Sequence, residues 1–559
     1  MRRLSLRHAV VAIAALGVAM LLASRYHRVP GGAPLVDVEL AQLPYFAFRS
    51  VLRLVVAYVG SFVFALSYGY AAASSKRAEK ILLPILDILQ SVPVVGFFPV
   101  AVAFFVAIAP GLAGVELAST FLIFTGMAWN MAFGVFEGLT TIPSDAVDAI
   151  DSFGVRGSQR ATKLLFPSVI PRLVPNSIIS WAGGWYFLIS CEIFSAGADR
   201  HTLPGLGSFL QRTMDEGRLR DNLLGVLTLV AVVVAFDLLL WRPLSTYAER
   251  FKYELTASSA RDENAVLEWW LRAKAPRAVR RALARPMRAL ARGGLKAWTG
   301  TLGRSAATRS WTGRAFALAG LALVALLVVE LVRALVNVAS SPWPAEARRV
   351  PLAVLASFGR LLVAYVIALA WTIPVAIWAG QRPRAAHLLT PIAEIGASVP
   401  AVALFPIMVV VLIGWIGVNG AAIALVLTGM QWYLLFNLLS GVTSIPEDLK
   451  EATRSLGMSR RQRWARLVLP AIAPAAVTGS ITGWGGGWNA LIVSEQIKYG
   501  GQTYNAFGIG QLLDDATNKP DNVLLGLSLV AMIAAVVVLN RLVWRRLYAW
   551  AAERFKIEY

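Results

Sequence analysis

The chain is dominated by continuous apolar runs, many of them longer than about 18 residues and almost free of charged side chains. A helix of that length is long enough to cross the hydrocarbon core of a bilayer. Hydrophobic residues make up 57% of the 559 residues and charged residues only 15%, which excludes a soluble enzyme of this size. Because the runs are continuous rather than alternating, they predict membrane helices and not a β-barrel.

About twelve such helices are expected. The sequence places them at roughly 9–24, 48–73, 81–108, 114–138, 168–195, 221–243, 315–337, 352–379, 388–413, 418–440, 471–496 and 522–544. The first run follows several arginines and resembles a signal peptide, but no small-residue cleavage site follows it, so we interpret it as an anchor helix. The connections alternate between basic and less basic segments. By the positive-inside rule, the basic connections and both termini are predicted to be cytoplasmic.

The chain also repeats itself. The segment R-L-V-V-A-Y-V at 53–59 recurs as R-L-L-V-A-Y-V at 360–366, and W-A-G-G-W at 181–185 recurs as W-G-G-G-W at 484–488. Six helices in each half is an even number, so both halves face the same way and the duplication is parallel. The predicted fold is therefore an all-α integral membrane protein with two parallel six-helix repeats and a path between them.

These repeats define the domain organisation. The first half spans 1–250, the second spans 315–559, and a linker rich in Lys and Arg joins them over 251–314. The linker is interpreted either as an amphipathic helix on the inner leaflet or as a solvated tether whose charge sets the topology. Nucleic-acid binding is not expected, because no recognition fold accompanies the positive charge.

A polar loop of the same design interrupts the apolar runs once in each half. Loop 142–167 reads I-P-S-D-A-V-D-A-I-D-S-F-G-V-R-G-S-Q-R-A-T-K-L-L-F-P, and loop 445–470 reads I-P-E-D-L-K-E-A-T-R-S-L-G-M-S-R-R-Q-R-W-A-R-L-V-L-P. Proline and acidic residues favour a helix N-terminus, and Gly154 or Gly457 then permits a sharp turn into a basic segment. The sequence predicts a helical knuckle that projects from the membrane toward a soluble partner; the alternative is an ordinary amphipathic loop.

The second loop resembles the E-A-A-x(3)-G motif of ABC importer permeases, with a threonine in place of the second alanine. The first copy departs further, since an aspartate replaces the glutamate. The residues that carry the resemblance are Glu451, Ala452 and Gly457 in the second loop and Asp148, Ala149 and Gly154 in the first. In that family this loop is the coupling helix, which docks on the ATP-hydrolysing subunit.

The resemblance covers both halves and is greatest to the type I, binding-protein-dependent permeases for nitrate, sulfonates, taurine and bicarbonate, in a fused, duplicated form. It implies two ABC ATPase subunits, identical or different, on the cytoplasmic side, a periplasmic or lipid-anchored substrate-binding protein, and the bacterial inner membrane as the location. No Gly-x(4)-Gly-Lys-Ser/Thr motif occurs in the chain. We therefore expect a non-enzymatic transport subunit without a cofactor, ATP and Mg being used by the partner ATPases.

Two prolines inside apolar spans are candidates for the translocation path of the solute. Pro93 and Pro400 each remove a backbone donor, and irregular backbone at membrane depth is tolerated where it lines a cavity. Ser91 and Ser398 lie beside them and offer hydroxyl groups. The alternative is a proline kink that serves packing alone.

A second set of path candidates follows the glycine-rich segments. Trp185 and Trp488 either line the path or anchor the chain at the membrane interface, and Asn489 stands where the first half has a tyrosine. Glu192 and Glu495 are costly inside a membrane and are therefore included as candidates. A structural role, pairing with a basic residue near a helix end, is favoured because a carboxylate repels an anion; a cationic substrate would make them ligands.

The function implied is ATP-driven import of a small solute, foremost an oxyanion. Two alternatives stay open: an ABC permease for a metal ion such as ferric iron, and a secondary transporter with parallel repeats, which needs ion-coupling acids inside the bundle. The four histidines are scattered without ligand spacing, and Cys191 is the single cysteine. No resident metal site is expected from such a pattern.

Overall fold

The computed structural model describes residues 40–91, 98–155, 158–196, 199–248, 251, 336, 340–499, 501–519 and 521–554. The helix expected at 9–24 lies outside these residues. So do the helix expected at 315–337 and the linker at 251–314, apart from the single positions 251 and 336.

Helices account for most of the first repeat. In chain order its elements are η1 (Leu40–Gln42), α2 (Leu43–Ala73), α3 (Lys76–Ser91), α4 (Phe98–Ile108), α5 (Leu112–Thr140), α6 (Ser144–Ser152), α7 (Ser158–Arg160), the π-helical turn η3 (Ala161–Leu165), α8 (Phe166–Glu192), β1 (Ile193–Ala196), β2 (Asp199–Thr202), α9 (Leu206–Asp215), α10 (Leu219–Phe236), the π-helical turn η4 (Asp237–Trp241) and α11 (Arg242–Ala248).

The second repeat follows the same order, except that the single helix α17 stands in place of α4 and α5 and is preceded by a 3-10 turn, η7. It contains η6 (Ala345–Arg349), α15 (Val350–Gly380), α16 (Pro383–Ser398), η7 (Ala401–Leu404), α17 (Phe405–Thr443), α18 (Glu447–Ser455), α19 (Arg460–Arg463), the π-helical turn η8 (Trp464–Val468), α20 (Leu469–Ser494), β3 (Gln496–Tyr499), β4 (Gln502–Asn505), α21 (Ile509–Asn518), α22 (Asn522–Leu539), the π-helical turn η9 (Asn540–Trp544) and α23 (Arg545–Arg554). Within α17 the backbone leaves the helical region at Gly417, with φ 68° and ψ 178°.

Seven helices in the described part of the chain are long and apolar enough to cross a membrane. They coincide with the spans expected at 48–73, 114–138, 221–243, 352–379, 418–440, 471–496 and 522–544. This agreement confirms the prediction of a helical membrane protein.

One expected span, 388–413, is not a continuous helix, and the prediction was wrong in this respect. In the second repeat α16 ends just before Pro400, and Val399 adopts an extended backbone with φ −80° and ψ 115°. A proline lacks a backbone N–H and disfavours helical conformation in the residue before it. Of the span expected at 81–108, the structure describes 81–91 within α3 and 98–108 as α4, and residues 92–97 lie outside the described residues.

Each repeat also contains a short antiparallel hairpin that the sequence did not predict. β1 pairs with β2, and β3 pairs with β4. Each hairpin follows directly on a long helix, because α8 ends at Glu192 and α20 ends at Ser494. The all-α prediction is therefore confirmed for the bundle, while two two-stranded sheets lie at one end of it.

The two repeats pack in the same way. In each repeat the central helix, α5 or α17, packs between two long neighbours, which are α2 and α8 in the first repeat and α15 and α20 in the second. One tyrosine and two tryptophans form an aromatic cluster in each repeat, and the tyrosine ring lies edge-on to the first tryptophan at 5.5 Å in both. The clusters are Tyr58, Trp181 and Trp241 in one repeat and Tyr365, Trp484 and Trp544 in the other.

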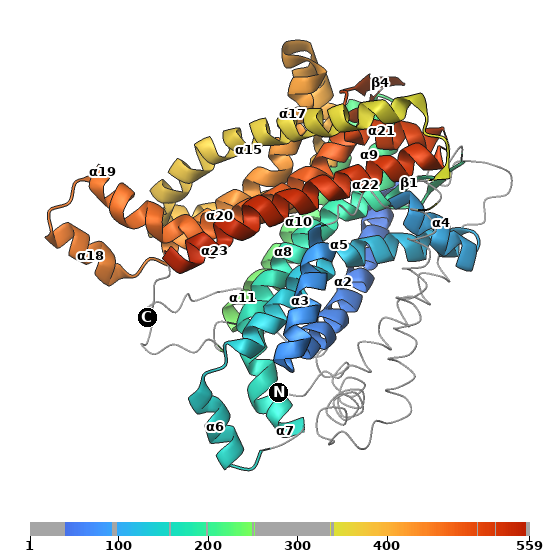
Figure 1. The fold of residues 1–559 in the computed structure, drawn as a ribbon. Helices are drawn as coiled ribbons and strands as arrows, with labels where there is room; N and C mark the ends of the chain where they lie inside the picture. The colour runs from blue at the N-terminus through green and yellow to red at the C-terminus, as the bar shows by residue number, and fades with distance from the viewer. Residues whose placement is uncertain are drawn as a thin grey trace.

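The two bundles lie against each other, and α8 contacts both α16 and η7 of the other repeat (Figure 1). The polar helices α6 and α18 project from one end of their bundles, which we call the knuckle end (Figure 1). The other end carries the hairpins and is called the hairpin end. Since α8 and α20 each start after a knuckle and end at a hairpin, both repeats run in the same direction.

Candidate functional site

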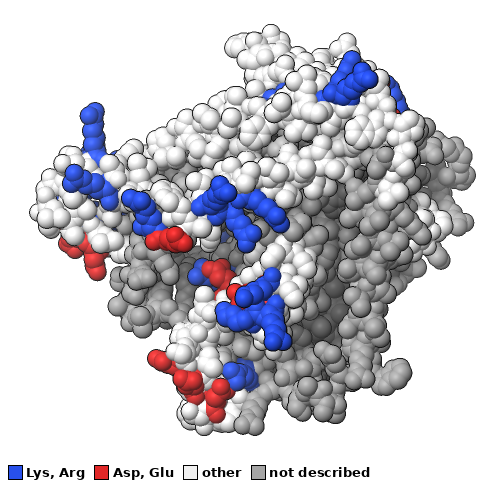
Figure 2. Space-filling model, in the orientation of Figure 1, with Lys and Arg blue, Asp and Glu red and all other residues white. Residues whose placement is uncertain are grey.

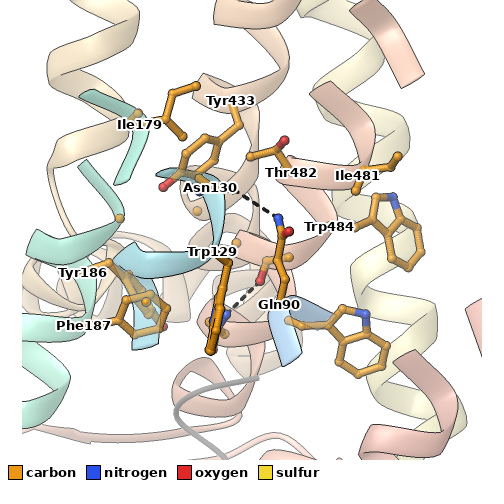
Figure 3. Close-up of a pocket in the computed structure, with 18 of the residues that line it drawn as sticks. Gln90, Trp129, Asn130, Ile179, Tyr186, Phe187, Tyr433, Ile481, Thr482 and Trp484 are labelled. Carbon is orange, nitrogen blue, oxygen red and sulfur yellow. Dashed lines mark hydrogen bonds between the residues drawn. The ribbon is translucent and has the colours of Figure 1, made fainter. Parts of the chain in front are cut away.

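A cavity of about 180 Å³ lies between the two repeats (Figure 3). Its walls come from α3, α5 and α8 of the first repeat and from α16, η7, α17, α20, α22 and η9 of the second. The polar residues that line it are Gln90, Thr125, Asn130, Tyr186, Thr428, Tyr433, Thr482, Asn489 and Asn540. The aromatic residues that line it are Trp129, Phe187, Trp484, Trp488 and Trp544.

Many cavity positions are equivalent in the two repeats. Thr125 and Thr428 occupy the same place in α5 and α17, and glycines line both walls at matching positions of α8 and α20. The cavity therefore lies near the axis that relates the halves. Because glycine has no side chain, α8 and α20 leave space between them at this level.

The larger polar side chains break this symmetry by an exchange. Asn130 and Tyr186 line the cavity from the first repeat, and the equivalent residues of the second repeat are Tyr433 and Asn489. Each wall thus offers one amide and one phenol, at swapped positions. A ligand between these walls meets different groups on its two sides.

The cavity lining is polar but uncharged. Among the described residues that form it, none has an Asp, Glu, Lys, Arg or His side chain. The Gln90 amide donates to Oδ1 of Asn130 over 3.1 Å (Figure 3). The Tyr186 hydroxyl and Oδ1 of Asn489 are buried without a hydrogen-bond partner among the described groups. The indole Nε1 atoms of Trp484, Trp488 and Trp544, which also belong to lining residues, are likewise buried without a partner among the described groups.

The structure distributes the sequence-predicted path residues over three places. Trp488 and Asn489 line the cavity, and Pro400 lies between the lining residues Val399 and Ala401. Trp185 is fully buried in the core of the first repeat.

Of the other candidates near the proline breaks, Ser398 is a buried residue at the end of α16. Ser91 is the last residue of α3, and Pro93 lies outside the described residues. Whether any of these residues contacts a solute stays a prediction.

Glu192 lies at the hairpin end, within a buried charge cluster of the first repeat. Its carboxylate accepts from Nη1 of Arg53 at 2.6 Å, from the Ser50 hydroxyl at 2.6 Å and from the Gly207 backbone N–H at 2.6 Å. Arg53 also contacts Glu116 through Nε at 2.7 Å, and Arg49 reaches the same carboxylate at 2.7 Å. Two arginines and two glutamates therefore compensate one another inside the protein.

Glu495 forms the equivalent cluster in the second repeat. Its carboxylate accepts from Nη1 of Arg360 at 2.7 Å, from the Ser357 hydroxyl and from the Gly510 backbone N–H at 2.7 Å. Here Asn419 stands in place of Glu116 and accepts from Nε of Arg360 at 3.0 Å. The pairing of arginine, serine and glutamate is thus built twice, and it fastens α9 or α21 to the bundle.

The glycines that complete these clusters were missed in the sequence. A Cβ on Gly205 or on Gly508 would lie 2.2 Å from the glutamate of its own repeat, which is closer than real Cβ contacts allow. The signal is a Gly-x-Gly that follows each glutamate in both repeats, at 205–207 and 508–510. It lies outside the apolar runs, and only the hairpin brings it back to the helix end.

The two knuckles share one backbone geometry. α6 and α18 begin directly after Pro143 and Pro446, and both end at a glycine with positive φ, 62° at Gly154 and 64° at Gly457. In the first knuckle the Val155 N–H donates to the Ile150 carbonyl oxygen at 3.2 Å, and the second repeats this bond at 3.2 Å. This is the Schellman helix end, which favours glycine.

The predicted coupling residues are displayed at the surface. Asp148, Ala149, Glu451 and Ala452 are exposed, and so are the two glycines. Phe153 is 82% exposed and Leu456 is 72% exposed, although both are large apolar residues in a polar segment. Acidic side chains lie at the tips of both knuckles with basic ones nearby (Figure 2).

Comparison with known families gives two matches within this chain. The model of the family described as "Binding-protein-dependent transport system inner membrane component" matches residues 62–241 and again residues 372–557. The chain belongs to this family. It is a fused permease with two family domains, as the internal repeat predicts.

Relatives of this permease occur in several bacteria. The taurine transport system permease protein of Escherichia coli is 32% identical over 202 residues, which cover 35% of this chain and 70% of that protein. The nitrate import permease protein of Leptolyngbya laminosa is 29% identical over 188 residues, or 34% of this chain and 64% of that protein. The bicarbonate transport system permease protein of Synechocystis is 30% identical over 188 residues, which cover 34% of this chain and 63% of that protein.

Proposed function

We propose that this permease forms the translocation path of an ATP-driven importer for a small solute that carries an oxyanion group. The observation that carries the proposal is the cavity shared by the two repeats, lined by equivalent positions of both. Relatives named for taurine, nitrate and bicarbonate support the substrate class. Alternating access follows if the two bundles move against each other around this cavity.

The knuckles α6 and α18 are proposed as the docking sites for two ATPase subunits. Each presents an acidic first turn, an exposed apolar residue and a glycine turn at the same end of the molecule. An apolar side chain at the tip of a rigid helix fits a cleft on a partner, and the charges around it steer the approach. The ATPases bind and hydrolyse ATP with Mg, while this chain supplies no phosphate-binding loop.

The direction of transport follows from this assignment. The knuckle end faces the cytoplasm of a bacterial inner membrane, and so do both termini, in line with the basic connections of the sequence. The hairpin end then faces the periplasm, where a substrate-binding protein delivers the solute. The clusters around Glu192 and Glu495 hold α9 and α21 rigid on that face.

The geometry gives less support to the two alternatives. Glu192 and Glu495 are the acids that a ferric-iron path or an ion-coupled secondary transporter would use first. Each is paired with an arginine and with a backbone N–H at the hairpin end. A carboxylate held in this way is not available to a passing cation without breaking a buried ion pair.

The proposal is tested by reversing the charge of one acidic side chain in each knuckle. Asp148→Lys combined with Glu451→Lys should leave membrane insertion intact, because both side chains are exposed. It should abolish co-purification of the ATPase subunits and ATP-dependent uptake into proteoliposomes. The matched control, used for co-purification only, is Glu216→Lys, an exposed acid between α9 and α10 at the hairpin end. Undiminished co-purification and uptake in the double variant would contradict the coupling role.

A further inference from the structure

Three arginines lie together on the outer surface of the second repeat, just beyond the end of α22. Arg541 belongs to the π-helical turn η9, and Arg545 and Arg546 open α23. All three residues are exposed, whereas Trp544 between them is buried and lines the cavity. Residues four or five positions apart lie above one another in such a turn. The three residues therefore form one outward-facing group, which we call the arginine patch (Figure 2).

The arginine patch lies at the depth of lipid headgroups. It follows directly on α22, whose 18 residues from Asn522 to Leu539 include no charged side chain. A helix of this length rises about 27 Å, which is close to the hydrocarbon thickness of a bilayer, about 30 Å. Since α22 starts near the hairpin end and runs toward the knuckle end, the patch lies at the bilayer boundary on the knuckle side (Figure 1).

The positive charges of the patch are not neutralised within the described part of the chain. None of the three arginine side chains has an ion pair or a hydrogen bond there. α23 packs on α20, and the 26 residues of α20 include no charged side chain. The acid within η9 and α23 is Glu553, about two helical turns beyond Arg546. The patch is thus open to an anionic partner from outside the described residues.

The first repeat has a different arrangement at the same place. Its Arg242 is equivalent to Arg545 and donates from Nε to Oδ2 of Asp237 at 2.9 Å. The second repeat has Asn540 in place of that aspartate, so Arg545 lacks the ion pair. The positions of the other two arginines hold a leucine and a proline in the first repeat. A general need for positive charge at this end of the bundle would apply to both repeats, so the patch serves something specific to the second.

Apolar and aromatic side chains share the outer surface with the patch. Val538, Leu542, Tyr548 and Trp550 are each between 48% and 54% exposed. Tyrosine and tryptophan are enriched at the boundary between membrane and water. The guanidinium group of arginine matches the oxygens of a phosphate and binds them through two parallel hydrogen bonds. A phospholipid brings both parts, a phosphate for the arginines and acyl chains for the apolar surface, whereas a soluble anion brings only the first.

We propose that the arginine patch binds the phosphate group of an anionic phospholipid in the leaflet at the knuckle end. Arg541 and Arg545, one turn apart, hold the phosphate oxygens, and Arg546 adds a third positive charge. The acyl chains lie along the exposed apolar face of α22. The proposed function places the knuckle end in the cytoplasm and so makes this the inner leaflet, but the contact itself does not depend on that orientation.

The test measures which lipids the purified full-length permease retains, by native mass spectrometry. The probe is an equimolar mixture of phosphatidylglycerol and phosphatidylcholine, added in detergent micelles. The wild type is expected to retain phosphatidylglycerol in preference. Arg541→Gln combined with Arg545→Gln is expected to reduce this retention at least about tenfold, because each basic residue near an anionic lipid surface contributes a factor of about five to the affinity.

Two further variants serve as matched controls. Arg348→Gln combined with Arg349→Gln also removes two exposed arginines, from η6 at the hairpin end, and should retain phosphatidylglycerol as the wild type does. Arg541→Lys combined with Arg545→Lys keeps both charges and should lose less of the lipid than the glutamine variant. All variants are expected to melt at the wild-type temperature, because the substituted side chains are exposed.

Four outcomes overturn the inference. Undiminished retention of phosphatidylglycerol in the glutamine variant is one, and an equal fall in the hairpin-end control is another, since it indicates general charge attraction. Displacement of the lipid by inorganic phosphate assigns the patch to a soluble anion instead. Loss of the ATPase subunits from the glutamine variant without added lipid assigns it to the ATPase surface. The proposed function is overturned separately, by absence of ATP-dependent oxyanion uptake in the complete transporter.

Discussion

The two repeats solve the same structural problem with different numbers of charges. In the first, Arg49 and Arg53 face Glu116 and Glu192, while the second keeps one arginine and one glutamate. Positions 49 and 116 are occupied in the second repeat by Ala356 and Asn419. One charge of each sign is therefore missing together, and both clusters stay neutral. The comparison teaches that charge balance, and not the number of ion pairs, is what the buried site requires.

The largest expected effect comes from breaking each cluster at its shared arginine. Arg53→Leu leaves Glu192 buried without an opposite charge and removes one of two partners from Glu116, whereas Arg360→Leu strands a single carboxylate. Each is expected to destabilise its half by about 3–5 kcal/mol, the first more than the second. Thermal unfolding of the purified permease measures both. Arg172→Leu, which removes an exposed pair with Glu137, is the control. Equal losses of stability in the two variants would show that the additional ion pair of the first repeat does not contribute to its stability.

A double substitution tests charge balance directly. Arg49→Ala and Glu116→Asn together convert the first cluster into the pattern of the second. Each single change leaves one uncompensated net charge in the buried cluster and should cost about 3 kcal/mol or more, while the pair should cost clearly less than the sum. Melting temperatures of the four proteins of this cycle give the coupling. Additive losses would mean that the two repeats are not interchangeable at this site.

The glycine turns of the knuckles should respond equally, since their backbones match. No atom lies within 4 Å of a Cβ built on Gly154 or Gly457, so crowding is not the issue. The cost comes instead from the backbone, whose φ is positive, 62° at Gly154 and 64° at Gly457. Gly154→Ala or Gly457→Ala should therefore each cost about 1–2 kcal/mol locally. The measurement is ATPase activity stimulated by the binding protein, which should fall in both. Gly359→Ala, in open space within α15, serves as control. A fall of ATPase activity in only one variant would show that the two knuckles contribute unequally to coupling.

The sequence predicted the repeat, the long helices and the knuckles, because periodicity and local turn residues determine them. It drew attention to Arg53 and Glu192 separately. That they meet across 139 positions depends on how α2 and α8 pack, which no local pattern contains. The same holds for the cavity. Asn489 and its tyrosine counterpart were noticed as a difference, but that both line one cavity follows from the tertiary fold.

The hairpins and the break within 388–413 were missed for another reason. That span is mostly apolar, and a proline in an apolar run is compatible with a kinked helix as well as with a helix end. The hairpins are four-residue strands, too short to give an alternating pattern. Only the glycines after each glutamate, needed where a carboxylate approaches the backbone, carried a signal at this end of the molecule.

The smallest expected effect lies at the outer corner between α9 and α10, where the repeats differ in sign. Glu216 accepts from Nε of Arg212 at 2.9 Å, and this bond lowers the pKa of the Glu216 carboxyl. At the equivalent positions the second repeat has Lys519 and Asp515, so the charges are reversed. Because the folded pKa is depressed, the stabilisation is present above the unfolded pKa of about 4.3 and is lost as the pH falls through the folded value.

The pH dependence is read from the difference in melting temperature between the wild type and Glu216→Gln. Solvent screens this exposed pair, so the difference should correspond to no more than a few tenths of a kcal/mol. It should stay constant from about pH 7 to pH 5 and shrink below the unfolded pKa of about 4.3. A difference that grows on acidification would mean that Glu216 is stabilised as the neutral acid and that its arginine contacts do not govern this corner.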